Sequence, residues 1–142
     1  MTLDAAILAY RLDVDPRFWA LSQEARDAAD NGIGPESRPL FRAFATAVLH
    51  RWRLGTRIHD VDFAYFNDGT RDGFHKANRR LRTNGRRIIL AEVAWWRFAE
   101  RAYLLWLNQR VFWAVESDEG WRAWRAAYDV AQAEGPERSA EA

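Results

Sequence analysis

The chain of 142 residues contains no cysteine. Disulfide bonds, thiolate metal ligands and cysteine nucleophiles are therefore excluded, and cysteine usage indicates no redox compartment. No stretch of about 20 residues is free of charge, so the sequence predicts no membrane-spanning helix. The N-terminal residues lack the basic region and small-residue cleavage site of a signal peptide. We therefore expect a soluble, cytoplasmic protein with no membrane partner.

Lysine is nearly absent, because only one of the 21 basic residues is not an arginine. Guanidinium groups bind phosphate well and stack on bases. The net charge is only +1, yet residues 38–87 hold twelve basic and four acidic side chains, while both flanking segments are net negative. The most basic stretch is residues 75–87, "HKANRRLRTNGRR". A chain that is balanced overall thus has a basic middle third.

Strand signals are equally scarce, since residues 56–69 form the only strand candidate and a single strand cannot make a sheet. This segment also fits a short helix or an irregular connection that ends in the Asn67-Asp68-Gly69 turn. Elsewhere, caps and apolar periodicity predict helices. The fold class expected is all-α: a single compact bundle of five or six helices over residues 1–135, with a frayed tail at 136–142.

Helix boundaries follow from capping residues and glycines. Thr2, Asp15 with Pro16, Thr70 and Ser117 mark starts, whereas Gly32, Gly55, Gly85 and Gly135 mark ends. The expected helices cover roughly residues 3–12, 16–31, 38–54, 70–83, 86–116 and 117–134. The longest, 86–116, is predicted to be an aromatic-rich central helix. Its aromatic stripe is typical of a core, so Trp95, Trp106 and Trp113 are expected to face inward.

Catalytic motifs are largely missing. No nucleophile elbow, glycine-rich phosphate loop or dinucleotide fingerprint is present. The His59-Asp60 doublet, with His50 nine residues earlier, is similar to the doublet of all-helical metal-dependent phosphohydrolases. Those enzymes need further His and Asp ligands on other helices, and this chain is short for their fold. We expect no enzyme, metal or cofactor, with phosphohydrolysis at His59 and Asp60 as the less favoured alternative.

The basic middle third supplies the candidate binding residues. No acid occurs in residues 73–91, so these arginines lack local partners, an arrangement tolerated when an anion is the partner. Asn78 and Asn84 add neutral donors. Arg80 or Arg87 is expected to turn toward the core edge of its helix. The candidate nucleic-acid-binding residues are Arg38, Arg42, Arg53, Arg71, Lys76, Arg79, Arg80, Arg82, Arg86 and Arg87.

Binding to the nucleic-acid backbone is predicted rather than base reading. A helix-turn-helix needs short polar readers on its recognition helix, and this segment is too uniformly basic. The expected ligand is RNA or single-stranded DNA, bound without sequence preference.

The helical architecture and the stretch "HKANRRLRTNGRR" resemble the small helical subunits of CRISPR effector complexes. That resemblance implies a non-catalytic subunit that holds nucleic-acid backbone beside other protein subunits and further copies of itself. It rests on no signature motif, so no residue role is carried over. The alternative is a phage- or plasmid-type interaction or inhibitor protein, an anti-defence or immunity factor, that binds an acidic protein surface.

Overall fold

The computed structural model describes residues 2–29 and 53–133, and all regular structure in these ranges is helical. The elements are α1 (Leu3–Ala9), the 3₁₀ helix η1 (Pro16–Ala20), α2 (Gln23–Ala28), α4 (Arg53–Tyr65), α5 (Arg71–Glu92), α6 (Phe98–Val115) and α7 (Asp118–Ala133). The predicted all-α fold is confirmed. No helix within these ranges is long and apolar enough to cross a membrane.

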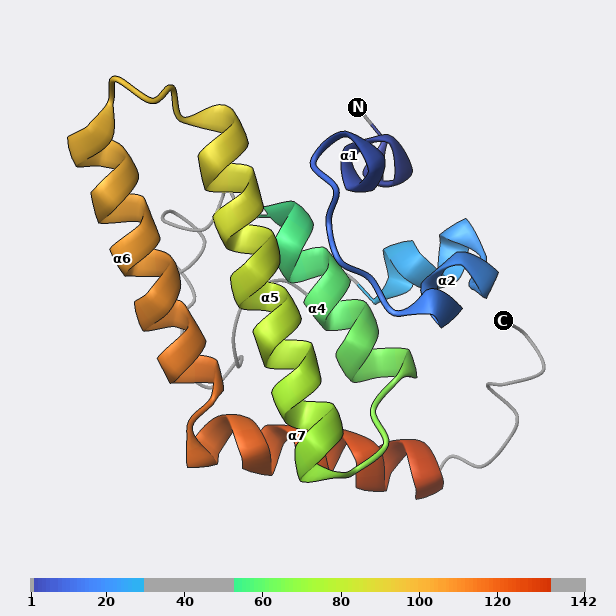
Figure 1. Ribbon diagram of the computed structural model, residues 1–142. Helices are drawn as coiled ribbons and strands as arrows, with labels where there is room; N and C mark the ends of the chain where they lie inside the picture. The colour runs from blue at the N-terminus through green and yellow to red at the C-terminus, as the bar shows by residue number, and fades with distance from the viewer. Residues whose placement is uncertain (1, 30–52, 134–142) are drawn as a thin grey trace.

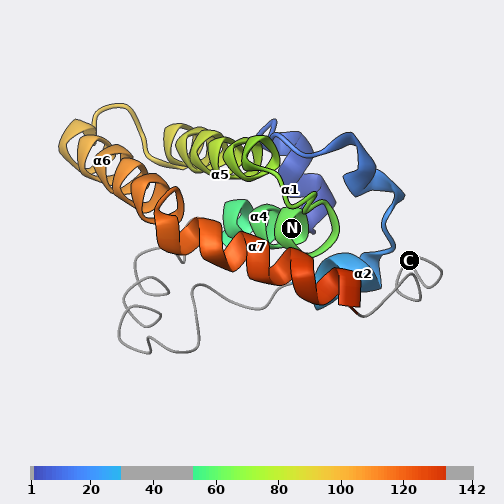
Figure 2. The ribbon, with the colours of Figure 1, turned by 90° about the horizontal axis from the view of Figure 1, so that it is seen from below.

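Helix α5 is the centre of the bundle. It packs against α6 on one side and α4 on the other (Figure 1). Helix α7 crosses one end of these helices, and α1 and α2 lie on the side away from α6 (Figure 2). The main core therefore forms where α1, α4, α5 and α6 converge. It contains Ile7, Leu12, Phe18, Ala29, Ile58, Val61, Ile88, Ile89, Val93, Leu104 and Leu107.

Side-chain caps start the helices where the sequence predicts. The Oγ1 atom of Thr2 accepts from the Ala5 N–H at 3.3 Å, and that of Thr70 accepts from the Gly73 N–H at 3.0 Å. The carboxylate of Asp15 caps η1, with Pro16 at its first position. Each such cap stabilises its helix by about 0.5–2 kcal/mol. Ser22 is a further cap, so the single helix expected over 16–31 is instead η1 followed by α2.

The predicted central helix over residues 86–116 is wrong. Helix α5 runs without interruption through Asn84-Gly85, and the chain breaks at residues 93–97 instead. Gly85 therefore lies within α5 and does not end it. A Cβ at Gly85 would overlap the Asn108 side chain, because it would lie 3.0 Å from Asn108 Cγ. The glycine thus allows α6 to approach α5 closely. After the break, Leu104 and Leu107 of α6 return to the core that Ile88 and Ile89 line.

Gly55 is also wrongly predicted as a helix end, because it is buried within α4. The ambiguous segment 56–69 proves helical to Tyr65 and then turns at Asn67-Asp68-Gly69. Gly69 has φ of +69°, and a Cβ at this position would lie 2.8–2.9 Å from the Tyr128 ring. Only glycine fits this turn. The helix expected over 38–54 lies outside the described residues except for its last two positions.

The tryptophans divide differently from the prediction. Trp124 of α7 is 1% exposed and packs with Phe74 and Ala77 of α5 in a second core. Trp95, Trp106 and Trp113, predicted to be core residues, are instead 75%, 56% and 55% exposed. Helix α6 has apolar side chains on every side, so periodicity alone does not identify its buried face.

Candidate nucleic-acid interface

Three arginines form a row along the outer side of α5. Arg79, Arg82 and Arg86 are all exposed, and their spacing of three and four residues places them on one helix face. The opposite side is fixed by packing, because Phe74, Ala77, Leu81 and Ile88 are buried. The row therefore lies on the side of α5 that faces away from the core. We call these three residues the α5 arginine row.

The α5 arginine row has no ion-pair partner among the described residues. Arg79 donates from Nε to the backbone oxygen of His75 at 3.3 Å. The guanidinium of Arg82 lies 5.2 Å from the centre of the Phe112 ring on α6. These contacts orient Arg79 and Arg82 without neutralising them, so with Arg86 three exposed positive charges lie along one face of α5.

The remaining candidates are placed less favourably. Arg71 lies over the Trp121 ring at 4.4 Å, and Lys76 pairs with Asp72 at 2.6 Å. Arg87 donates to the backbone oxygen of Arg11. Arg53 is exposed at the start of α4. Arg38, Arg42 and His50 lie outside the described residues.

Arg80 belongs to the protein interior rather than to the interface. Its Nη1 donates to both carboxylate oxygens of Asp62 at 2.7 Å, and its Nε lies 3.8 Å from Asp13. The Asp62 side chain is 3% exposed and that of Arg80 is 15% exposed. Removing Arg80 would leave the Asp62 carboxylate buried and unpaired. We therefore leave Arg80 out of the proposed interface.

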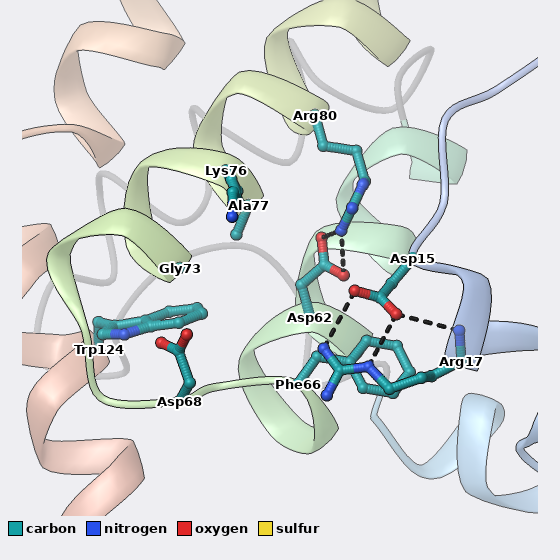
Figure 3. Close-up of a pocket in the computed structure, with 10 residues that line it drawn as sticks. All are labelled: Asp15, Arg17, Asp62, Phe66, Asp68, Gly73, Lys76, Ala77, Arg80 and Trp124. Atoms are coloured by element: carbon teal, nitrogen blue, oxygen red, sulfur yellow. Dashed lines mark hydrogen bonds and ion pairs between the residues drawn. The ribbon is translucent and has the colours of Figure 1, made fainter.

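The Arg80–Asp62 pair lines a pocket of about 140 Å³ beside α4 and α5 (Figure 3). Asp15 and Arg17 form a second pair in it, with Arg17 Nε donating to Asp15 at 2.9 Å. The bond from Arg17 holds the pKa of Asp15 below its ordinary value. Burial raises the pKa of Asp62 to about 6 despite the opposing effect of Arg80. The charged side chains that line the pocket thus largely compensate one another. This balance does not favour an anion site in the pocket.

The described residues do not build the metal site that the less favoured phosphohydrolase alternative would need. No group of three or more His, Cys, Asp or Glu side chains suited to a metal occurs in residues 2–29 and 53–133. The Nε2 atom of His59 lies 2.9 Å from Asn78 Oδ1, and burial lowers the pKa of His59. A neutral imidazole engaged with Asn78 is typical of a structural histidine. His75 likewise pairs with Glu116.

The aromatic face of α6 is the feature that the sequence analysis missed. Tyr103, Trp106 and Trp113 are more than half exposed, and Arg110 lies 5.8 and 5.7 Å from the two Trp ring centres. The buried residues Leu104, Leu107 and Asn108 occupy the other side of the helix. One signal was available: residues 101–115 contain no acid. That absence distinguishes this face from an ordinary solvated helix face.

Comparisons with known proteins identify no relative. No protein-family model, curated protein or solved structure matches the chain.

Proposed function

We propose that the protein is a non-catalytic subunit that binds nucleic-acid backbone through α5 within a larger ribonucleoprotein assembly. The observation that carries this proposal is the α5 arginine row, three exposed guanidinium groups on the central helix that have no ion-pair partner in residues 2–29 and 53–133. Seven residues of helix separate Arg79 from Arg86, which corresponds to about 10.5 Å. A row of this length can contact more than one phosphate.

The surroundings of the row favour a polyanionic ligand. Neighbouring like charges on a helix repel each other, and a bound phosphate chain removes that repulsion while releasing its counterions. Arg80, the one arginine of the segment aimed inward, is matched by Asp62. The interior cation is therefore compensated, whereas the part of the chain that the structure describes offers the outward row no acid.

Backbone contact is favoured over base reading by the position of two amides. Asn78 and Asn84 are both fully buried. Asn84 binds the backbone of Asp13, and Asn78 donates to Glu116 at 2.7 Å. These side chains are the neutral donors of the basic segment, so neither is available to a base edge. Apart from Thr83, the exposed side chains of residues 75–87 are Lys76 and arginines, which bind phosphate without distinguishing sequences.

The test is the salt dependence of binding to fluorescein-labelled oligonucleotides, measured by anisotropy. Replacing Arg79, Arg82 and Arg86 with Gln should reduce the slope of log affinity against log salt by about 2 on single strands and about 3 on duplex. Affinity should fall equally for unrelated sequences. The matched control replaces the exposed arginines Arg11, Arg122 and Arg125 with Gln, removing the same charge elsewhere. Equal slopes for the two triple variants would reject the α5 interface.

An acidic protein surface is the second candidate partner. The exposed Trp and Tyr side chains of α6 favour it, because these residue types and Arg are enriched in the energetic centres of protein interfaces. A phage- or plasmid-type inhibitor would use the same arginines. It would lose its protein partner in the triple variant while showing no nucleic-acid binding in either form.

A further inference from the structure

The outer face of α6 consists of a small-residue half and an aromatic half. Helix α6 lies at the edge of the bundle, with α5 on its inner side, in both ribbon views (Figure 1, Figure 2). Because successive residues turn by about 100°, one set of exposed side chains falls within an arc of about 100° on the outer side. In chain order, these residues are Ala99, Ala102, Tyr103, Trp106, Arg110 and Trp113. We call these six residues the α6 outer face.

The aromatic half has the composition of a protein interface. Tyr103, Trp106 and Trp113 are each more than half exposed, so together they offer roughly 300 Å² of surface. Arg110 lies within cation–π range of both Trp rings. Trp, Tyr and Arg are the residue types enriched at the energetic centres of protein interfaces. The α6 outer face is therefore suited to a protein partner.

The charge on this face is small enough for a second copy of the chain to be that partner. Arg110 is its single charged side chain, since Arg101 is turned toward α5 and donates to the Leu90 backbone oxygen at 2.8 Å. In an antiparallel pair with its twofold axis at Trp106, the two Arg110 residues lie about 12 Å apart along the helices. This separation exceeds the Debye length of about 8 Å at physiological salt.

The two halves of the face complement each other in size across such an axis. Trp113 follows Trp106 by seven residues, and Ala99 precedes it by seven. Each Trp113 therefore lies opposite Ala99 of the second copy, and large side chains meet small ones at both ends. Tyr103 and Arg110 lie three residues before and four residues after the axis, which places each ring beside a guanidinium of the other copy.

A parallel pair does not have this complementarity. It would place Trp113 against Trp113 and Ala99 against Ala99, which overpacks one end and leaves a gap at the other. The sizes of the side chains thus select the antiparallel arrangement.

We propose that α6 is a dimerisation helix, through which two copies of this chain pack α6 against α6 in an antiparallel pair. This inference goes beyond the proposed function and does not depend on the α5 arginine row. The rings of two copies would bury roughly 600 Å². With the alanines and Arg110, the contact approaches the lower limit of about 1,200 Å² for specific interfaces. The dimer should therefore be reversible and depend on protein concentration.

Sedimentation velocity over a range of protein concentrations measures this equilibrium. Wild type should change from monomer to dimer as its concentration rises. Trp106→Ala and Trp113→Ala should each raise the dissociation constant by roughly 30-fold or more, because each removes a central ring from both copies. Trp19→Ala is the matched control, since Trp19 is an exposed tryptophan of η1, and should leave the dissociation constant unchanged.

A size exchange tests the arrangement itself. Ala99→Trp adds apolar surface, so it would strengthen a non-specific association. In the proposed pair it should weaken the dimer, because the position opposite is already filled by Trp113. Adding Trp113→Ala to Ala99→Trp exchanges the large and small positions and should restore most of the affinity. A stronger dimer for Ala99→Trp alone would overturn the arrangement.

Cross-linking tests the antiparallel direction, and the chain has no cysteine to interfere. Ala102 lies four residues before the axis and Gln109 three residues after it, on the same edge of α6. A mixture of Ala102→Cys and Gln109→Cys proteins should form a disulfide-linked dimer under copper–phenanthroline oxidation. Ala102→Cys alone should not, because its two copies would lie about 12 Å apart along the helices, beyond disulfide reach.

The outcomes separate this inference from the proposed function. Replacing Arg79, Arg82 and Arg86 with Gln should leave dimerisation unchanged, so either proposal can fail without the other. A wild type that stays monomeric at every concentration would overturn the dimer, and so would efficient cross-linking of Ala102→Cys with itself. At concentrations where wild type is monomeric, Trp106→Ala should unfold like wild type. A large loss of stability there would show that the chain itself covers the ring, which would also overturn the dimer.

Discussion

Asn84 binds the backbone of Asp13 with both ends of its amide. The Asp13 N–H donates to Asn84 Oδ1 at 2.7 Å, and Asn84 Nδ2 donates to the Asp13 carbonyl at 2.8 Å. Asn84 is fully buried. This pair fastens the segment between α1 and η1 to the middle of α5, across 71 residues of sequence.

Asn84→Ala should lower the free energy of unfolding by about 2–4 kcal/mol. The substitution removes two hydrogen bonds to the backbone of Asp13, each contributing about 0.5–1.5 kcal/mol, and leaves a cavity at a fully buried position. Thr83→Ala is the control, because Thr83 is an exposed neighbour and should change stability by less than about 0.5 kcal/mol. Urea denaturation of both variants measures the difference, and similar values would contradict the two-point attachment.

Two buried glycines should respond oppositely to alanine. A Cβ at Gly85 would overlap the Asn108 side chain, whose Nδ2 donates to the Arg82 carbonyl at 2.9 Å. Gly85→Ala should therefore destabilise the protein by about 1–3 kcal/mol. A Cβ at Gly55 would lie 3.7 Å from its nearest neighbours, which is ordinary contact.

Gly55→Ala should consequently be neutral or stabilise the protein by about 0.4–1 kcal/mol, because alanine restricts the unfolded chain. The melting temperatures of the two variants provide the comparison. A stable Gly85→Ala protein would mean that α6 can move away from α5 at little cost.

The sequence predicted local features better than tertiary ones. Thr2, Asp15 and Thr70 cap helices as predicted, because a cap is decided by residues only two or three positions apart. The pair Asn84-Gly85 is predicted to end a helix but lies within α5. Both residues are instead explained by contacts with residues far along the chain, since Asn84 binds Asp13 and Gly85 packs against Asn108. No local pattern distinguishes a glycine that ends a helix from one that admits a packed side chain.

The candidate site was predicted in the same uneven way. The absence of acids near Arg79, Arg82 and Arg86 in sequence correctly indicated that they have no local ion pair. It failed for Arg80, since Asp62 reaches it from α4. The aromatic face of α6 was not predicted, because a helix with apolar side chains on every side does not reveal which side is buried.

Trp106 and Trp124 should differ sharply in their contribution to stability. Trp124 is 1% exposed and contacts Phe63 and Phe74 edge-on, so Trp124→Ala should cost about 3–5 kcal/mol. Trp106 is 56% exposed, and Trp106→Ala should cost less than about 1 kcal/mol. Chemical denaturation of the two variants gives both numbers. Comparable losses would place Trp106 in a core.

The Asp62–Arg80 pair sets two electrostatic effects against each other. Burial disfavours the carboxylate, and the guanidinium favours it. Burial is the larger effect, so the pKa of Asp62 rises to about 6 from its ordinary value of 3.8. In the folded protein the carboxyl therefore takes up a proton at a pH where the unfolded chain does not. Protonation then favours folding, and acidification between about pH 6 and pH 4 should stabilise the wild type relative to Asp62→Asn.

The gain in unfolding free energy should reach up to about 3 kcal/mol, because the pKa of Asp62 lies near 6 when folded and near 3.8 when unfolded. Unfolding free energies of wild type and Asp62→Asn, measured from pH 7 to pH 4, isolate this contribution because other groups titrate in both proteins. Asp72→Asn is the control: the hydrogen bond from Lys76 lowers the pKa of the exposed Asp72 below its ordinary value of 3.8, so any loss of stability lies below pH 4, and wild type and that variant should keep the same relative stability from pH 7 to pH 4. The opposite result would be a fall, toward pH 4, in the unfolding free energy of wild type relative to Asp62→Asn. It would mean that the guanidinium outweighs burial and that Asp62 is a carboxylate in the folded protein throughout this range.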